Sequence, residues 1–215
     1  MRTELPEGFQ RAEFQYAHGF IDRVVDRLDL KKEIAKLLAL HEPRHRYRSG
    51  DLAEPDRLLH EKRAKLPEMT AKQAYAQVLG ARDQRRISPQ EILESLCDGI
   101  VELSGDRCFG TDAALRGGLA WFDDRPITWL ITEKGQGLAS KIEHHYGMPH
   151  PEGYRMAIRL MKEAERFGRP IITIIDTPGA YPGIGAEERG QGAAIADSLY
   201  AMSSLTVPVI SLVSG

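Results

Sequence analysis

The chain has 215 residues, a formal net charge of −2 and a hydrophobic fraction of 42%. These values fit one good-sized globular domain, or one domain with an appendage. The charge gives no reason to expect nucleic acid as a partner, and no apolar run approaches the roughly 20 residues that cross a bilayer. The N-terminus lacks the basic-then-apolar pattern of a secretion signal, so we expect a cytoplasmic protein without membrane or nucleic-acid partners.

The first 42 residues are expected to form a helix, a break at Gly19, a short strand over residues 20–25 and a second helix. An apolar stripe marks the second helix: Leu30, Ile34, Leu37 and Leu38. About forty residues are too few for a core of their own. This segment therefore needs another surface to pack on.

Residues 43–56 are charged and carry Pro43, Gly50 and Pro55 without an apolar period, which predicts a linker. A basic cluster in this stretch could contact an anionic partner, although a solvated linker is the favoured interpretation. The cluster consists of Arg44, His45, Arg46 and Arg48.

Residues 57–104 are expected to be mainly helical. Ser88 is a capping residue before Pro89, and Glu91 follows three positions after it, which is typical of a helix start. A core-facing apolar stripe follows at helical spacing: Ile92, Leu96, Ile100 and Leu103.

Beyond residue 105 strands and helices alternate. Residues 116–122 and 126–132 are expected to form a hairpin that turns at Asp123–Asp124. A helix should begin at Pro151 and end at Gly168. Two strands buried on both faces, over 171–175 and 207–213, should flank a helix whose inward side chains are Ile195, Leu199, Met202 and Leu205. This order predicts a mostly parallel sheet.

The loop after Ile171–Ile175 is rich in glycine and proline, which are few in side-chain atoms and leave backbone N–H groups accessible. Loops at the carboxyl ends of parallel strands commonly bind ligands, and a following helix N-terminus suits an oxyanion. A tight connection without a ligand is an equally favoured interpretation. The sequence "DTPG", which many GTPases contain, is also present. A GTPase also needs the phosphate-binding motif G-x-x-x-x-G-K-[ST], which this sequence does not contain, so we exclude the GTPase class.

Three histidines, His144, His145 and His150, could form a zinc site in principle. Adjacent histidines on a helix diverge by about 100°, so surface or capping roles are favoured. Neither Cys97 nor Cys108 lies at a metal-binding spacing. We therefore expect no metal in this chain.

Several phrases together are more specific than any one of them: "LSGDR" at 103–107, "GGLA" at 117–120, the run from Tyr146 to Gly192, and "VPVI" at 207–210. They closely resemble the α subunit of the bacterial acetyl-CoA carboxylase carboxyltransferase, over about residues 58–215. The phrase "LPEGFQRAEF…HGFIDRVV" resembles the C-terminal end of the β subunit. The chain thus looks like a fragment of a fused β–α carboxyltransferase.

The resemblance implies a crotonase-like (ClpP/crotonase) α/β fold, an incomplete superhelix of ββα units with a parallel sheet, preceded by helical segments. Four parts are expected: a β-like tail (1–42), a linker (43–56), a helical region (57–104) and a truncated α-like core (105–215). It also implies an enzyme of fatty-acid biosynthesis, which transfers the carboxyl group of carboxybiotin to acetyl-CoA to give malonyl-CoA. The implied partners are the biotin carboxyl carrier protein, biotin carboxylase and the remaining carboxyltransferase segments, in a homo- or hetero-oligomer.

By the same resemblance, the backbone amides of Gly179 and Ala180 would stabilise the oxyanions of the reaction. The biotin side of the site would comprise Pro178, Gly179, Ala180, Tyr181, Pro182 and Gly183. The candidates for the CoA phosphates are Lys134, Lys141, Arg155 and Arg159, although for the two arginines a surface-charge role is equally favoured.

The sequence also departs from the family's pattern. Gln136 stands where the family has a cation, and the family's glycine-rich oxyanion segment would follow Gly215. The zinc ribbon of the β subunit is not in this sequence and is expected in the missing β part. We therefore expect the chain not to catalyse alone. The alternatives are a non-catalytic assembly fragment and another crotonase-fold acyl-CoA enzyme.

Overall fold

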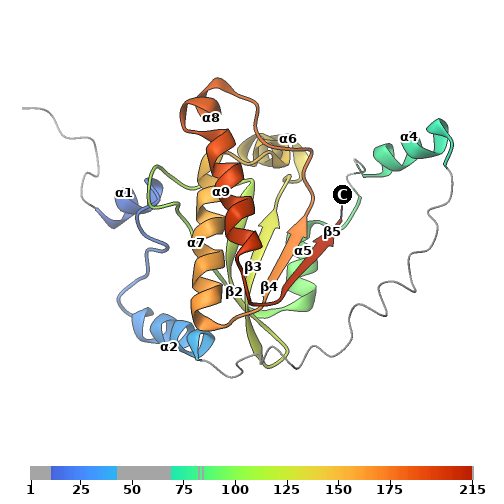
Figure 1. Cartoon of the computed structure of the whole chain (residues 1–215). Helices are drawn as coiled ribbons and strands as arrows, with labels where there is room; N and C mark the ends of the chain where they lie inside the picture. Colours follow the sequence, from blue (N-terminus) through green and yellow to red (C-terminus); the bar gives the residue numbers. More distant parts are fainter. Residues whose placement is uncertain (1–10, 43–68, 82, 84, 215) are drawn as a thin grey trace, which may run out of the picture.

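A computed structural model describes residues 11–42, 69–81, 83 and 85–214. At its centre is a five-stranded sheet with the strand order β1-β2-β3-β4-β5 (Figure 1). The pairs β1–β2 and β2–β3 are antiparallel, whereas β3–β4 and β4–β5 are parallel. The bounds are Asp98–Glu102 (β1), Leu115–Phe122 (β2), Arg125–Thr132 (β3), Ile171–Ile175 (β4) and Val209–Val213 (β5). The predicted linker, residues 43–56, lies outside the described residues.

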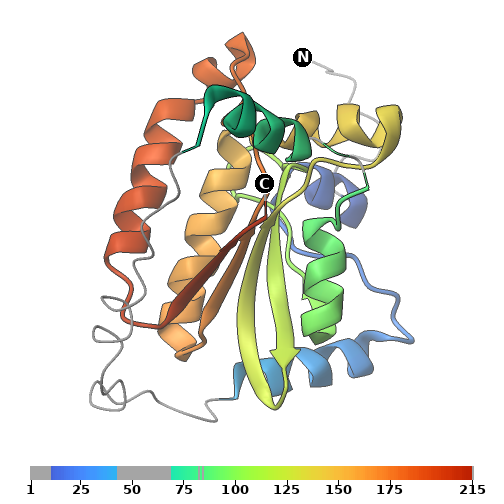
Figure 2. The ribbon, with the colours of Figure 1, turned by 90° about the vertical axis from the view of Figure 1, so that its right-hand side faces the viewer.

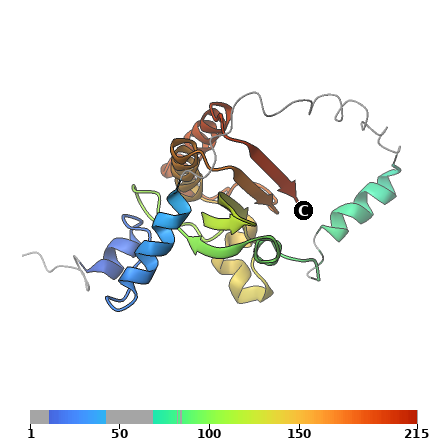
Figure 3. The same cartoon turned by 90° about the horizontal axis from the view of Figure 1, so that it is seen from below.

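Helices cover both faces of the sheet. Helices α7 and α9 lie on one face and α5 on the other, as Figure 2 shows edge-on. Seen from below in Figure 3, α1 and α2 lie on one side of the molecule and α4 on the opposite side. The helix bounds are Ala12–Ala17 (α1), Leu30–His41 (α2), Ala71–Gly80 (α4), Pro89–Leu96 (α5), Gly137–Glu143 (α6), Pro151–Phe167 (α7), Ile184–Glu188 (α8) and Gln191–Ser203 (α9), with a 3₁₀ turn, η1, at His145–Gly147.

The core has two layers because alternate residues of a strand point to opposite faces. Trp129 and Ile131 of β3 belong to the cluster under α5, which is centred on Leu93. Leu130 belongs to the cluster under α7, which contains the fully buried Leu160. β3 is buried on both faces from Pro126 to Thr132 and is mainly apolar. Its fully buried Thr128 is paired, since the hydroxyl accepts a hydrogen bond of 3.1 Å from the guanidinium of Arg169.

Local signals in the sequence fix several element boundaries. Ser88 forms the predicted capping box with Glu91 at the start of α5. Helix α7 begins at Pro151 and ends before Gly168, whose φ of 67° is the left-handed conformation that glycine adopts readily. The hairpin turns at Asp123–Asp124 as predicted, since Phe122 pairs with Arg125.

The N-terminal segment packs on the core, as its length required. Leu40 of α2 is fully buried in the cluster under α7. The imidazole of His41 lies 3.0 Å from a carboxylate oxygen of Glu163. Asp22 accepts a hydrogen bond of 2.8 Å from Arg159 and also pairs with Arg107. The N-terminal segment, residues 11–42, is thus packed against helix α7 and the loop before β2.

Two predictions about secondary structure are wrong. Residues 20–25 form bends and extended coil instead of a strand. The helical stripe predicted through Ile100 and Leu103 ends at Leu96, because Asp98–Glu102 pairs with β2 as strand β1. Pairing with the hairpin therefore overrides the helical period, and residues 57–104 are not helical throughout.

The orientation predicted for α9 is confirmed in part: Leu205 packs against the cluster under α7, whereas Leu199 and Met202 face solvent. Leu199 is 67% exposed, whereas the small side chains Ala194 and Ala201 are buried where α9 packs on α7. The strand β5 was expected to be buried on both faces, yet Ile210 is 60% exposed. Among the described residues β5 pairs only with β4, so it is an edge strand. Within the described parts of the chain, no helix combines the length and apolarity needed to span a membrane.

Candidate functional site

The glycine-proline loop lies at the carboxyl end of β4, as predicted for a ligand-binding loop. Its first residue, Asp176, is buried, and its backbone N–H donates to the hydroxyl of Thr132 at 2.6 Å. Pro178 and Gly179 are exposed, so the loop turns outward from the sheet edge. Gly179 has a φ of 147°, which residues with a side chain rarely adopt. Glycine is therefore required at the tip.

The amides of this loop differ in whether they are already bonded. The Gly179 N–H donates to the hydroxyl of Thr177 at 3.1 Å, and the Tyr181 N–H donates to the Pro149 carbonyl at 3.1 Å. The amides of Ala180 and Gly183 make no hydrogen bond to any residue in the described part of the chain. Ala180 is thus the better placed of the two predicted catalytic amides.

Ion pairs hold the first residue of the loop in place. The buried carboxylate of Asp176 pairs with Lys134 and lies 3.7 Å from the guanidinium of Arg86. The hydroxyl of Thr177 donates to the Gly147 carbonyl at 2.6 Å, which ties the loop to η1. Of the two lysines predicted to bind CoA, Lys134 is therefore engaged with Asp176. Lys141, half-buried in the last turn of α6, makes no ion pair with a described residue.

The two predicted CoA arginines are engaged inside the protein. Arg155 donates to Asp106 at 2.7 Å and to Glu152 at 3.1 Å. Arg159 donates to Asp22 at 2.8 Å. Both guanidinium groups therefore already have carboxylate partners within the fold.

Asp106 organises the loop before β2. One carboxylate oxygen accepts the N–H groups of Cys108, Phe109 and Gly110 at 2.7–2.9 Å. Burial alone would raise the pKa of Asp106, but these three bonds and that from Arg155 outweigh it and hold the pKa below its ordinary value. Asp106 is thus an ionised anchor for both this loop and α7.

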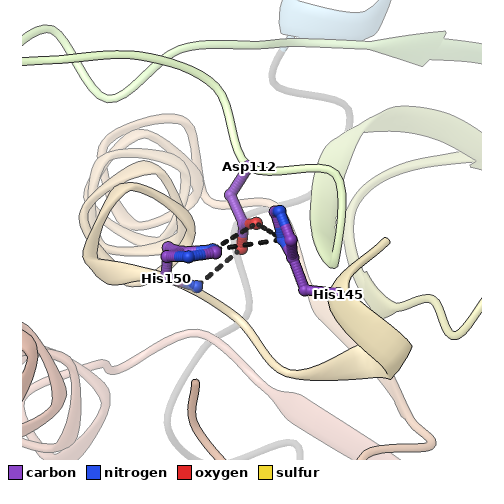
Figure 4. Close-up of side chains that lie close together, drawn as sticks. All are labelled: Asp112, His145 and His150. Atoms are coloured by element: carbon purple, nitrogen blue, oxygen red, sulfur yellow. Dashed lines mark hydrogen bonds and ion pairs between the residues drawn. The ribbon is translucent and has the colours of Figure 1, made fainter. Parts of the chain in front are cut away.

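A second cluster lies next to the glycine-proline loop. Asp112, from the loop before β2, and His145 and His150, from the connection between α6 and α7, point toward one another (Figure 4). The ring of Tyr181 stacks on that of His150, with centroids 4.1 Å apart. Burial alone would raise the pKa of Asp112, but its bonds to the two histidines and to the Ala114 N–H hold the pKa below its ordinary value. The cluster therefore places an ionised carboxylate between two imidazoles.

Sequence reasoning did not single out Asp106, Asp112 or Asp176. Each acts through partners far along the chain, such as Arg155 for Asp106 and His150 for Asp112. Asp176 carried the only local signal, because it directly follows a buried strand at the edge where ligands bind.

The chain matches the family described as acetyl co-enzyme A carboxylase carboxyltransferase-like over residues 22–215. It is 42% identical, over its whole length, to the acetyl-coenzyme A carboxylase carboxyl transferase subunits beta/alpha of Clostridium tetani, of which it covers 36%. It is 40% identical to the protein of the same name from Natranaerobius thermophilus, covering 37%. Over 135 residues, or 63% of the chain, it is 51% identical to the alpha subunit of Streptococcus gordonii, covering 53%.

Solved structures support the fold. A single-chain, multi-domain long-chain acyl-CoA carboxylase aligns with 98% of this chain and 19% of its own, with a TM-score of 0.66 and 17% identity. The transcarboxylase 12S hexamer aligns with 61% of this chain and 24% of its own, with a TM-score of 0.50 and 21% identity.

These comparisons confirm the crotonase-like fold and the resemblance to both carboxyltransferase subunits. The chain spans between about a third and a half of the length of the relatives it matches. It belongs to the acetyl co-enzyme A carboxylase carboxyltransferase-like family.

Proposed function

We propose that the protein containing this chain transfers the carboxyl group of carboxybiotin, held on a carrier protein, to acetyl-CoA, giving malonyl-CoA. The observation that carries the proposal is the unbonded amide of Ala180 in an outward-facing loop at the carboxyl end of β4. Negative charge develops on the thioester oxygen of acetyl-CoA and on the ureido oxygen of biotin during transfer. Backbone N–H donors stabilise such charge. The N–carboxyl bond of carboxybiotin would break as the new C–C bond forms, and the proton that leaves the acetyl methyl group would go to the freed ureido nitrogen, so no side-chain acid or base is needed.

The roles of the other loop residues follow from this assignment. Pro178, Gly179, Tyr181, Pro182 and Gly183 would line the biotin side, with Gly179 allowing the turn. Biotin supplies the carboxyl group when it is bound, and the chain's own contribution is to hold the developing oxyanion. Because Gly179 already donates to Thr177, Ala180 is the donor we assign to the reaction, with Gly183 as a second.

For the CoA phosphates we assign Lys141 first, since its ammonium has no carboxylate partner among the described residues. Lys134 would contribute charge while it also fixes Asp176. The guanidinium groups of Arg155 and Arg159 are held by Asp106, Glu152 and Asp22, so we assign these two residues to structural ion pairs and not to the CoA phosphates.

The proposed context is fatty-acid biosynthesis in the cytoplasm. The partners would be the biotin carboxyl carrier protein, biotin carboxylase and the remaining β-like and α-like segments, in an oligomer. The names of the relatives, subunits beta/alpha and subunit alpha, support a site assembled from both kinds of segment.

The test is carboxyl exchange between malonyl-CoA and biocytin, measured on the full-length gene product. Transfer to biocytin supports the proposal. No transfer, from a protein shown to be folded, would leave the non-catalytic assembly fragment as the better interpretation. Transfer from methylmalonyl-CoA but not from malonyl-CoA would favour another acyl-CoA substrate.

A further inference from the structure

The cluster of Asp112, His145 and His150 has the residue types and the geometry of a metal site. The two Nδ1 atoms lie 3.1 Å apart, and they lie 3.4 Å (His145) and 3.8 Å (His150) from the same oxygen of Asp112 (Figure 4). Two imidazoles and a carboxylate are a ligand set that zinc commonly takes.

The dimensions of this triangle match those of a bound zinc ion. For sides of these lengths, the point equidistant from all three atoms lies about 2.0 Å from each. Zn–N and Zn–O bonds are about 2.0–2.2 Å long. An ion of this size therefore fits with little movement of the side chains. It would take the place of the hydrogen bond between the two facing Nδ1 atoms.

Hydrogen bonds from the backbone hold the carboxylate of Asp112 in its orientation, as is usual for carboxylates that bind metals. The side chain of Asp112 is fully buried. One oxygen accepts a hydrogen bond from the backbone N–H of His150 at 3.2 Å, and the other accepts one from the backbone N–H of Ala114 at 3.3 Å. These two bonds leave the oxygen that faces the imidazoles with lone-pair capacity for a cation.

The backbone turns His145 back toward the other two ligands. His145 and Tyr146 are both left-handed, with φ of 48° and 56°. Two consecutive non-glycine residues in this region are uncommon and disfavoured. The pair of left-handed residues sends the His145 side chain toward Asp112 while the adjacent His144 points elsewhere, bonding the Ser140 carbonyl at 2.8 Å.

The cluster opens onto a pocket of about 560 Å³, which all three side chains line. The same pocket is lined by Cys108, whose thiol is exposed and of a kind that also binds zinc. Three protein ligands beside an open space leave a fourth position for water or a small ligand, as in zinc sites that bind or transform molecules.

From this geometry we propose that Asp112, His145 and His150 bind one divalent transition cation, zinc above all, in a site separate from the loop amides. The sequence alone favoured surface or capping roles for the histidines because it could not place Asp112 beside them. The site does not depend on the proposed carboxyl transfer. Through the stacking of His150 on Tyr181, a bound cation would also hold the loop that contains Ala180 in place.

The test is zinc and cobalt(II) binding by the full-length protein after removal of metal, with metal counted per chain. A zinc ribbon elsewhere in the full-length protein would be common to all variants. We expect His145→Asn to lose one equivalent of zinc and the part of the cobalt(II) visible spectrum that belongs to it. Asparagine tolerates the left-handed conformation, so this variant should keep the turn.

The matched control is His144→Ala, which removes the adjacent imidazole outside the cluster. This variant should bind as many equivalents of zinc per chain as the wild type. A second measurement is the melting temperature, which added zinc should raise in the wild type more than in His145→Asn, because binding to the folded state alone stabilises it. Equal metal content in wild type and His145→Asn, or equal zinc-dependent shifts in the two proteins, would overturn the proposal.

Discussion

Asp22 accepts a hydrogen bond from Arg159 although 137 positions separate them in the sequence. Asp22 lies in the N-terminal segment, residues 11–42, and Arg159 lies in helix α7. The same carboxylate pairs with Arg107, so one acid neutralises two partly buried guanidinium groups. This contact, together with the burial of Leu40, fixes the N-terminal segment on the core.

Asp22→Asn should therefore destabilise the fold. The substitution leaves two guanidinium groups without their shared counter-charge, and hydrogen bonds to charged groups are each worth about 1.5–3 kcal/mol. We expect a loss in that range, measured by urea unfolding. The surface pair of Arg85 and Asp83 is the control, because Asp83→Asn should change stability little. Similar losses in the two variants would show that the Asp22 contact is no stronger than a surface pair.

Ala180→Pro should reduce carboxyl exchange by about 10²- to 10³-fold, the usual effect of removing one oxyanion donor. Proline has no N–H, so it deletes the donor we assign. The comparison is Ala180→Gly, which keeps the N–H and should lose less than about tenfold, the span of 1.4 kcal/mol. Equal rates for the two variants, both folded by circular dichroism, would exclude the Ala180 amide from the reaction.

Gly118→Ala should destabilise the protein by about 3 kcal/mol or more. A Cβ at this position would overlap the carbonyl oxygen of Val101 on β1 and lie 2.9 Å from the ring of Trp129. Backbone cannot move aside as a flexible side chain can, so the hairpin must shift away from β1. Thermal unfolding measures the loss.

The control for this substitution is Gly192→Ala. Gly192 lies in helix α9, and an added Cβ there meets no atom within 4 Å. Alanine is favoured over glycine in helices by about 1 kcal/mol, so this variant should be stabilised or unchanged. A loss at Gly192 as large as that at Gly118 would contradict the steric explanation.

Stability at acid pH should depend on Asp106. Its pKa in the folded protein lies below the ordinary value of 3.8, so the unfolded chain binds more protons. The contribution of Asp106 is complete above that ordinary value and is lost as the pH falls through the lower, folded pKa. Asp106→Asn should therefore be less stable near neutral pH and should lose less further stability below about pH 4.

This prediction is checked by urea unfolding at a series of pH values. Asp83→Asn is the control, because Asp83 pairs with Arg85 on the surface, where water and salt screen the interaction. The free energy of unfolding of this control should fall at acid pH as it does in the wild type. If Asp106→Asn also loses as much stability at acid pH as the wild type, the three amide bonds of Asp106 do not favour its ionised form.

The sequence allowed prediction of the elements that depend on local chemistry. Pro151 and Gly168 bound α7, and the all-apolar Ile171–Ile175 is β4. Ile100 and Leu199 were misplaced because the apolar period alone does not say which surface covers a residue. Ile100 pairs in a sheet, and α9 turns its small side chains toward α7.

Of the two candidate sites, one is made of residues that are neighbours in the sequence and the other is not. The position of the glycine-proline loop could be predicted, since it directly follows the all-apolar strand β4 within a few consecutive residues. The approach of Asp112 to His145 and His150 could not, because 33 and 38 positions separate the acid from the imidazoles and only the fold brings them together.

The attachment of residues 11–42 has a consequence for how the polypeptide can be divided. Noncovalent contacts from Asp22, Leu40 and His41 hold this segment, so the peptide connection to the rest is not what keeps it there. A protease site engineered between residues 43 and 68 should, once cut, yield two fragments that elute together in gel filtration. One polypeptide would then contain an assembly that two separate polypeptides could also form.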